Sequence, residues 1–328
     1  MLYTYAIEPE ALATWTTCRL FLNLMGFQHG RAIAAYPTRK RWKALVRTAC
    51  RENGDLGDRD HRRILRKLEQ SNGKLVRLEV EYDDGLEPAA ERWIRNAVDR
   101  QTAQSAFHAI LSTRNPTNHP DVVLDEDVDE SHDKFDVPRE QPVMRQAQEL
   151  AAHIATLVVN SREMLLVDPH LDLSKQKWRP VIAACFDLAG RSIRDTPRAE
   201  IHTLDTDAKW SSEEFRKQCQ RYIPGMMTGR LTSVRVRRWR LRDNEPHDFH
   251  ARYVLTERGG YRLDKGLDEQ PGVEQPVGLL DDQEWKRVRE GYSDAKAFFF
   301  DRADAFTLDK SGALRPEPLR HEPAHSPR

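Results

Sequence analysis

The chain has 328 residues, of which 39% are hydrophobic and 32% are charged, and its 52 basic residues balance its 52 acidic residues. The hydrophobic content is sufficient for a folded core and excludes a disordered chain, and the length allows two domains. A net charge of zero excludes a protein whose overall field attracts nucleic acid, although local basic patches remain compatible with it.

The first 114 residues alternate between helical and extended patterns. Apolar residues at helical spacing predict helices, and alternating apolar residues predict strands. We therefore predict an α+β N-terminal region over residues 1–114, without a recognisable catalytic constellation. Its predicted helices cover residues 14–27, 39–53, 61–73 and 87–101, and its predicted strands cover residues 2–7, 74–85 and 106–113.

Residues 115–142 break this pattern, because they are rich in Pro, Asp and Glu and their apolar residues follow no period. Such a composition is typical of a flexible acidic connector, and we predict a linker here. The segment also contains a spacing similar to that of a calcium loop, but the glycine and the terminal glutamate of such a loop are missing. We therefore predict no metal site from the residues concerned, which are Asp125, Asp127, Asp129 and His132.

From residue 143 onward, helices and strands follow one another regularly. Strands separated by helices of about 10–15 residues predict βαβ units. We predict an α/β domain over residues 143–310, with a mixed, mostly parallel sheet flanked by helices, and then a disordered, Pro-rich tail over residues 311–328. The predicted helices cover residues 144–161, 178–191 and 211–223, the strands cover 163–173, 199–207 and 233–242, a hairpin covers 247–266, and a last helix and strand lie within 282–308.

The cysteines and the first residues of the chain bear on its location. Cys18, Cys50, Cys185 and Cys219 form no closely spaced pair, and buried free thiols are typical of a reducing compartment. The opening "MLYTYAIEPE" lacks the basic and apolar segments of a signal peptide, and no apolar run approaches the roughly 20 residues of a membrane span. We expect a cytoplasmic protein that does not associate with membranes.

One stretch combines a histidine, a cation and a carboxylate. His250, Arg252 and Glu257 have the spacing H-x-R-x4-E, and residues two apart on a strand face the same side. A histidine can attack phosphorus or protonate a leaving oxygen, and a neighbouring cation neutralises phosphate charge. Glu257 is expected to orient the histidine or the arginine. Asp168 and His170 follow a predicted strand, where α/β sheets bind ligands, so we expect them to shape or contact this site; a simple turn at the strand end is the alternative.

Residues 161–268 resemble the phospholipase D superfamily, whose signature is H-x-K-x4-D on a strand, followed by a Gly-Ser or Gly-Thr pair. The resemblance also rests on "VDPHL" at an earlier strand and on the order of strands and helices. It implies a phospholipase D-like fold in which His250 is the nucleophile or general acid, Arg252 replaces the lysine and Glu257 the aspartate, while Gly266 marks the Gly-Ser position. The motif is similar in particular to that of bacterial proteins of this superfamily, some of which occur in phage-defence gene sets.

The chain departs from the family pattern in three respects. The family builds a site from two motifs, whereas this chain has one, so an active enzyme would be a homodimer that brings two His250 residues together. Arg252 and Glu257 differ from the signature, and Leu267 and Asp268 stand where the family has a hydroxyl residue and an amide. These departures favour an alternative, which is a catalytically inactive module that binds nucleic acid or a partner protein.

The strand before the motif, "VRVRRWRLR", is rich in arginine. We expect it to contact a phosphate backbone through Arg235, Arg237 and Arg240, with Trp239 able to stack on a base. The alternative is an edge strand whose charges prevent aggregation. Phosphate contacts do not read base sequence, so this strand supports a nuclease without naming its target.

Together these features predict a metal-independent phosphodiesterase that needs no cofactor and cleaves DNA or RNA through a histidine intermediate. The resemblance implies a role in bacterial phage defence, with other defence proteins as partners. Lipid phosphodiester transfer is the weaker hypothesis, because the sequence shows neither a membrane anchor nor an amphipathic apolar face.

Overall fold

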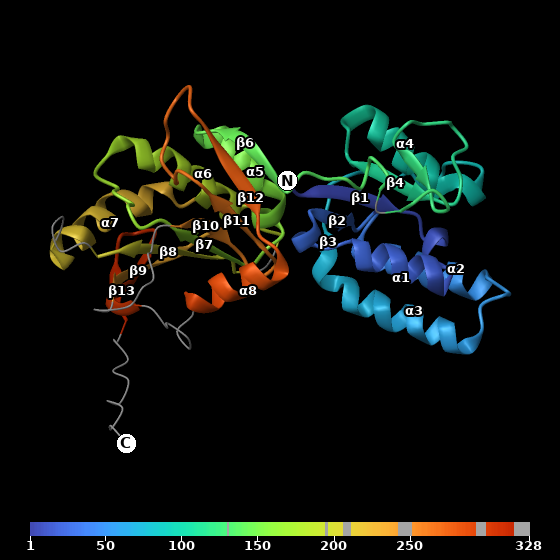
Figure 1. Ribbon diagram of the computed structural model, residues 1–328, viewed down its shortest axis with the longest axis horizontal. Coiled ribbons are helices and arrows are strands. Elements are labelled where there is room, and N and C mark those ends of the chain that lie inside the picture. Colours follow the sequence, from blue (N-terminus) through green and yellow to red (C-terminus); the bar gives the residue numbers. More distant parts are fainter. Residues whose placement is uncertain (130, 194–195, 206–210, 242–250, 293–299, 318–328) are drawn as a thin grey trace, which may run out of the picture. The chain divides into compact units, whose positions relative to one another are not determined.

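The computed structural model describes residues 1–129, 131–193, 196–205, 211–241, 251–292 and 300–317, with the backbone alone for residues 240–241 and 300–303. The chain forms two compact units, Met1–Arg139 and Glu140–Arg328, and each unit has its own sheet (Figure 1). In these described ranges, every helix is too short or too polar to cross a bilayer. The four cysteines are buried and unpaired.

The sheet of the first unit is entirely parallel, with the strand order β3-β2-β1-β4-β5. The order reverses between β1 and β4, which is the arrangement of a doubly wound α/β fold. The α+β class predicted for this half is therefore wrong. The strands are β1 (Tyr3–Ile7), β2 (Arg31–Ala34), β3 (Leu75–Val76), β4 (Ala109–Ser112) and β5 (Val122–Leu124).

Helices cover both faces of this sheet. Figure 1 shows α1 (Trp15–Leu24), α2 (Arg39–Glu52) and α3 (Asp58–Gln70) on one face, and α4 (Arg92–Gln104) on the other. The side chains of Thr14 and Thr38 accept backbone N–H groups at the starts of α1 and α2, as helix N-caps do. The apolar side of each helix then packs on the sheet, for example through Phe21, Trp42 and Ile64. Short 3-10 turns cover Glu10–Leu12, Phe27–His29, Ser71–Lys74 and Ala89–Glu91.

The segment predicted to be an acidic linker, residues 115–142, is part of the fold. It contains β5, and Val128 and Phe135 are buried in the core of the first unit. Its apolar residues follow no period because they come from a short strand and from separate turns; Phe135, for example, packs against Tyr5 of the central strand β1. The end of the segment forms the start of β6, so the boundary between the units falls at residue 139.

The second unit has a nine-stranded mixed sheet, with the order β14-β13-β9-β8-β7-β10-β11-β12-β6. Strands β7, β8 and β9 are parallel, and every other neighbouring pair is antiparallel. The prediction of a mixed sheet is confirmed, whereas the prediction that it is mostly parallel is wrong. The strands are β6 (Glu140–Met144), β7 (Glu163–Val167), β8 (Arg198–Leu204), β9 (Ser233–Leu241), β10 (Arg252–Leu255), β11 (Gly260–Leu263), β12 (Glu274–Leu279), β13 (Phe300–Asp309) and β14 (Leu314–Pro316).

Helices flank this sheet on both faces as well. Figure 1 shows α5 (Ala147–Val159), α6 (Arg179–Gly190) and α7 (Ser212–Met226) on one face, and α8 (Asp282–Gly291) on the other; a 3-10 turn, Gln176–Trp178, precedes α6. The tail predicted from residue 311 is partly ordered, because β14 pairs with β13. Residues 318–328 lie outside the described ranges.

Candidate functional site

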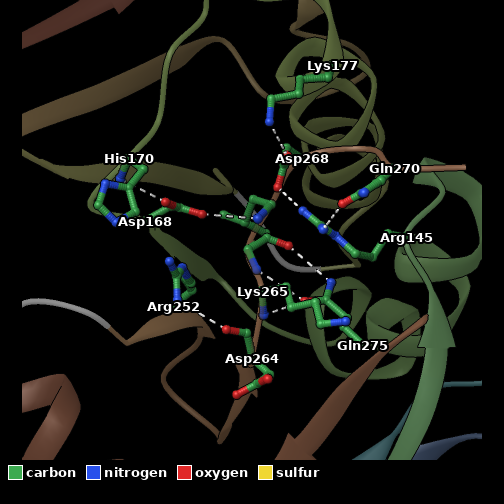
Figure 2. Close-up of polar contacts among 12 residues, drawn as sticks. Arg145, Asp168, His170, Lys177, Arg252, Asp264, Lys265, Asp268, Gln270 and Gln275 are labelled. Atoms are coloured by element: carbon green, nitrogen blue, oxygen red, sulfur yellow. Dashed lines mark hydrogen bonds and ion pairs between the residues drawn. The ribbon is translucent and has the colours of Figure 1, made fainter. Parts of the chain in front are cut away.

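Asp168 directly follows β7 and lies at the centre of a buried polar cluster (Figure 2). Its side chain is 1% exposed. Oδ1 accepts the N–H of His170 at 2.9 Å, and Oδ2 accepts the N–H of Leu267 at 3.0 Å. Asp168 therefore joins the end of β7 to the loop after β11, which lies about a hundred residues further along the chain. This geometry gives Asp168 a shaping role and leaves neither oxygen without a donor.

The pKa of Asp168 is raised to about 6. Burial is the main cause, since it disfavours the charged carboxylate, and the negative charge of Asp268 adds to it. The two backbone N–H groups and the positive charge of Arg252 act in the opposite direction. The carboxyl group thus changes charge close to neutral pH, within a site that also holds a cation.

Gly266 allows the loop after β11 to approach Asp168. Its φ of +121° is one that side chains rarely adopt, and a Cβ at this position would lie 2.9 Å from Oδ2 of Asp168, 3.4 Å from Oδ1 of Asp268 and 3.7 Å from Nε of Arg252. Gln275, which is fully buried on β12, holds the loop by accepting the N–H groups of Lys265 and Gly266 and donating to the Gly266 carbonyl. Gly266 thus marks the point where two carboxylates and a guanidinium converge.

Arg252 is the first residue of β10 and is half-buried. One terminal nitrogen, Nη1, donates to the carbonyl of Asp264 at 3.1 Å, as Figure 2 shows. Its Nε is buried and has no hydrogen-bond acceptor among the described residues. A buried donor without a partner is costly, and an anion bound beside it would remove that cost.

Asp268 adds a second carboxylate and two further cations. Arg145, which is 6% exposed, pairs with Oδ1 of Asp268, and Nζ of Lys177 lies 2.7 Å from Oδ2. Figure 2 shows these two side chains reaching Asp268 from different segments. An acidic residue after Gly266 would repel phosphate if it were unpaired, but here the two cations neutralise it. The cluster of Arg252, Arg145 and Lys177 with Asp168 and Asp268 carries one net positive charge when both aspartates are ionised.

The structure unites some of the predicted site residues and separates others. Arg252, Asp168 and Gly266 lie together, and His170 is exposed beside them. His250 lies outside the described residues. The expectation that Glu257 orients the arginine is wrong, because its carboxylate accepts the N–H groups of Arg162 and Glu163 at the start of β7. Since β10 and β7 are antiparallel, that point lies at the opposite end of the strands from Arg252.

The arginine-rich strand is β9, which lies between β8 and β13 and is not an edge strand. Arg237 is 3% exposed, with its Nε 3.4 Å from Glu200, and Arg235 pairs with both Glu200 and Glu317. Trp239 is buried and donates to Nδ1 of His202, so it does not present its ring to a base. The side chain of Arg240 is outside the described residues. Arg235 and Arg237 therefore do not form the expected phosphate-binding track, because they pair with carboxylates within the second unit.

Glu200 is the acceptor at the centre of this internal network. Burial alone would raise the pKa of Glu200, but His202, Arg237 and Arg235 outweigh it and lower the pKa to about 2. Because Trp239 donates to Nδ1 of His202, the proton of the neutral ring lies on Nε2, which is 3.3 Å from Glu200. The carboxylate thus stabilises the fold in its ionised form.

Glu200→Gln is expected to destabilise the protein at neutral pH by roughly 3 kcal/mol, and by much less in acid. The folded-state pKa is depressed, so the stabilisation is present above the unfolded value of about 4.5 and is lost as pH falls towards 2. Urea unfolding at a series of pH values measures it, with Glu274→Gln, an exposed residue of β12, as the control. A difference between wild type and Glu200→Gln that stays constant from pH 7 to pH 3 would contradict this assignment.

The first unit has its own ligand-type position, where the strand order reverses between β1 and β4. Glu8, which follows β1 and is 1% exposed, occupies it. Its Oε2 accepts the hydroxyl of Ser112 and both the N–H and the hydroxyl of Thr113 at 2.8 Å each. At this position Glu8 therefore joins the end of β1 to the end of β4 by hydrogen bonds within the chain.

Sequence reasoning missed Arg145, Lys177 and Gln275, and gave Asp268 no constructive role. Arg145 and Lys177 meet Asp268 across 123 and 91 residues of chain, so no local spacing connects them. Gln275 lies ten residues from Lys265, on the next strand, and an isolated glutamine in a strand carries no distinguishing pattern.

Comparisons with known proteins add little to these observations. No protein-family model matches the chain, and no curated protein does. Among solved structures, the archaeal chromatin protein TrmBL2, described as showing a novel mode of DNA binding, is 13% identical, with 74% of this chain and 83% of that chain covered and a TM-score of 0.24. A likeness at this TM-score supports no conclusion about this chain.

Proposed function

We propose that the second unit is a phospholipase D-like domain that cleaves phosphodiester bonds of nucleic acid in the cytoplasm. The observation that carries the proposal is the position of Arg252, whose buried Nε faces the convergence of Asp168 and Gly266 without an acceptor among the described residues. The phospholipase D resemblance assigns the phosphate-binding cation and the glycine turn to these same residues.

In this mechanism Arg252 binds the non-bridging oxygens of the phosphate, and His250, two residues before it, attacks phosphorus. The bond from phosphorus to the leaving oxygen breaks as the bond to the imidazole forms, and a proton is supplied to the leaving oxygen. Water then hydrolyses the phosphohistidine. Because each chain has one motif, the proton donor is the His250 of a second copy, and the enzyme is a homodimer. Asp168 keeps the Gly266 loop in place through its two backbone contacts.

The alternative function is a module that binds phosphate groups without cleaving them. One observation favours it, namely the presence of two carboxylates within 3.4 Å of the Gly266 Cβ position, next to the arginine. Ionised Asp168 repels a second anion, so this module would bind phosphate more tightly as pH falls through about 6.

The test compares wild type with His250→Ala on fluorescent single- and double-stranded DNA and RNA in the presence of EDTA. We expect cleavage by wild type, no cleavage by His250→Ala, and full cleavage by His119→Ala, which removes a histidine of the first unit. Equal cleavage by wild type and His250→Ala would overturn the catalytic proposal. Binding without cleavage, weakened in Arg252→Ala, would establish the alternative instead.

A further inference from the structure

Helix α3 carries a stripe of arginine side chains on the side away from the core. Ile64 and Leu68 face the core of the first unit and are fully buried. The exposed stripe lies on the opposite side, because its members follow the i, i+3, i+4, i+7 spacing of one helix face. It consists of Arg59, Arg62, Arg63 and Arg66, all of them exposed.

The nearby carboxylates leave most of this stripe unneutralised. Asp60 pairs with Arg63 at 3.1 Å, while Glu69 turns to the other side and binds Lys43 and Arg47 of α2. For Arg59, Arg62 and Arg66, no ion pair is formed within the part of the chain that the structure describes. Like charges at these helical spacings repel one another, and none of them is needed to bury the core. In a chain of zero net charge, this local excess of positive charge indicates an anionic partner.

Helix α1 borders the stripe and adds a groove with apolar surface. Trp15, Arg19 and Asn23, four residues apart, lie along the side of α1 nearest α3: the guanidinium of Arg63 stacks over Trp15, and Lys67 donates to Asn23 at 2.6 Å. The groove along α1 has a volume of about 410 Å³, and its lining includes Leu20, which is 36% exposed. The α1–α3 face, defined by Trp15, Arg19 and Leu20 with the stripe and Lys67, thus combines cations with an apolar surface.

We infer that the α1–α3 face binds the phosphate backbone of a nucleic acid. Arginine outnumbers lysine on it, and the planar guanidinium matches phosphate with two hydrogen bonds. The stripe from Arg59 to Arg66 is about 10 Å long at 1.5 Å per residue, which is long enough to contact about two successive phosphates of one strand. Leu20 and Trp15 offer an apolar surface for a sugar or base. Contacts of this kind are independent of base sequence.

This binding function belongs to the first unit and does not depend on cleavage by the second. The test therefore uses the full chain with His250→Ala in every sample, so that no cleavage consumes the probe. The change is Arg62→Gln with Arg66→Gln, and the matched control is Arg39→Gln with Lys40→Gln, two exposed cations at the start of α2. Thermal unfolding followed by circular dichroism checks that each variant is folded, and Arg62→Gln alone serves if the double variant is not.

Fluorescence anisotropy of labelled single-stranded DNA at several salt concentrations gives the affinity and its salt dependence. Loss of two phosphate contacts is expected to reduce the slope of log K against log salt by about 1.4, which corresponds to roughly 25-fold weaker binding at 0.1 M salt. The control is expected to keep the original slope. An unchanged slope in the α3 variant, or an equal loss in the control, would overturn the inference. Equally tight binding of labelled poly-aspartate would overturn the assignment to nucleic acid.

Discussion

Replacing Arg252 by alanine is expected to lower phosphodiester cleavage by about a hundred- to a thousandfold, as the loss of a preorganised donor to transition-state charge does. The stability of the protein should fall only modestly: the buried Nε has no acceptor among the described residues, but the change removes the hydrogen bond from Nη1 to the Asp264 carbonyl and a positive charge beside Asp168. Arg252→Lys should recover part of the rate, since it keeps the charge but loses the planar fork. Initial rates on a labelled oligonucleotide measure the effect.

The matched control is Arg262→Ala, on β11. Arg262 is exposed and lies opposite Tyr253 of β10 in the sheet. It therefore carries the same charge as Arg252 and lies on the strand next to it. Similar rates for Arg252→Ala and Arg262→Ala would show that the cluster around Gly266 is not the reacting site. If the chain only binds, the same pair of variants should differ in affinity for an oligonucleotide.

Gly266→Ala is expected to destabilise the second unit by about 3 kcal/mol. Two costs add: the φ of +121° is unfavourable for a side chain, and the new Cβ would lie 2.9 Å from Oδ2 of Asp168. Movement that relieves this clash would separate Asp168 from the N–H of Leu267. The loop that contains Gly266 and Leu267 would then shift beside Arg252. The free energy of unfolding in urea measures the stability, and the cleavage or binding assay measures the site.

Gly272→Ala separates the two costs. Gly272 also has a positive φ, of +76°, but a Cβ there would meet nothing within 4 Å. It is therefore expected to lose about 1 kcal/mol, from backbone strain alone. A Gly266→Ala variant as stable as Gly272→Ala would show that the contact with Asp168 relaxes without cost.

Helices with a strong period were predicted well, and strands held by distant partners were not. The helix predicted over 39–53 is α2, Arg39–Glu52, because its apolar residues repeat at the helical spacing. Strand β2 was missed, since its four residues form a strand through pairing with β1 and β3. Over residues 74–85 the alternation is real, but it has another cause: Leu78, Val80 and Tyr82 pack on the core beside α4, while Leu75–Val76 alone pairs as β3.

The same limit applies to the charges. The residues of β9 were correctly predicted as a strand, yet their exposure was not, because Arg235 meets Glu200 across 35 residues and Glu317 across 82. The first half of the chain was predicted to have no catalytic constellation, and the arginines on the outer face of α3 have the spacing of any solvent-exposed helix face. That face became a candidate surface once the structure showed that Asp60 pairs with Arg63 and that Glu69 pairs with Lys43 and Arg47 of α2.

The phospholipase D resemblance brought Gly266 forward, together with Arg252 and Asp168, as an expected site. Local chemistry in the sequence was enough to place most helices and strands and to indicate an α/β fold for the second half. These inferences hold because periodicity and turn residues act over a few positions. Local patterns in the sequence could not show which cations remain available to bind a phosphate. Arg237 is neutralised within the sheet, Asp268 is shielded by Arg145 and Lys177, and Glu257 binds the far end of β7. Each of these outcomes depends on a charge brought close by the fold, because the strength of an ion pair falls with the distance in space and is independent of the separation along the chain.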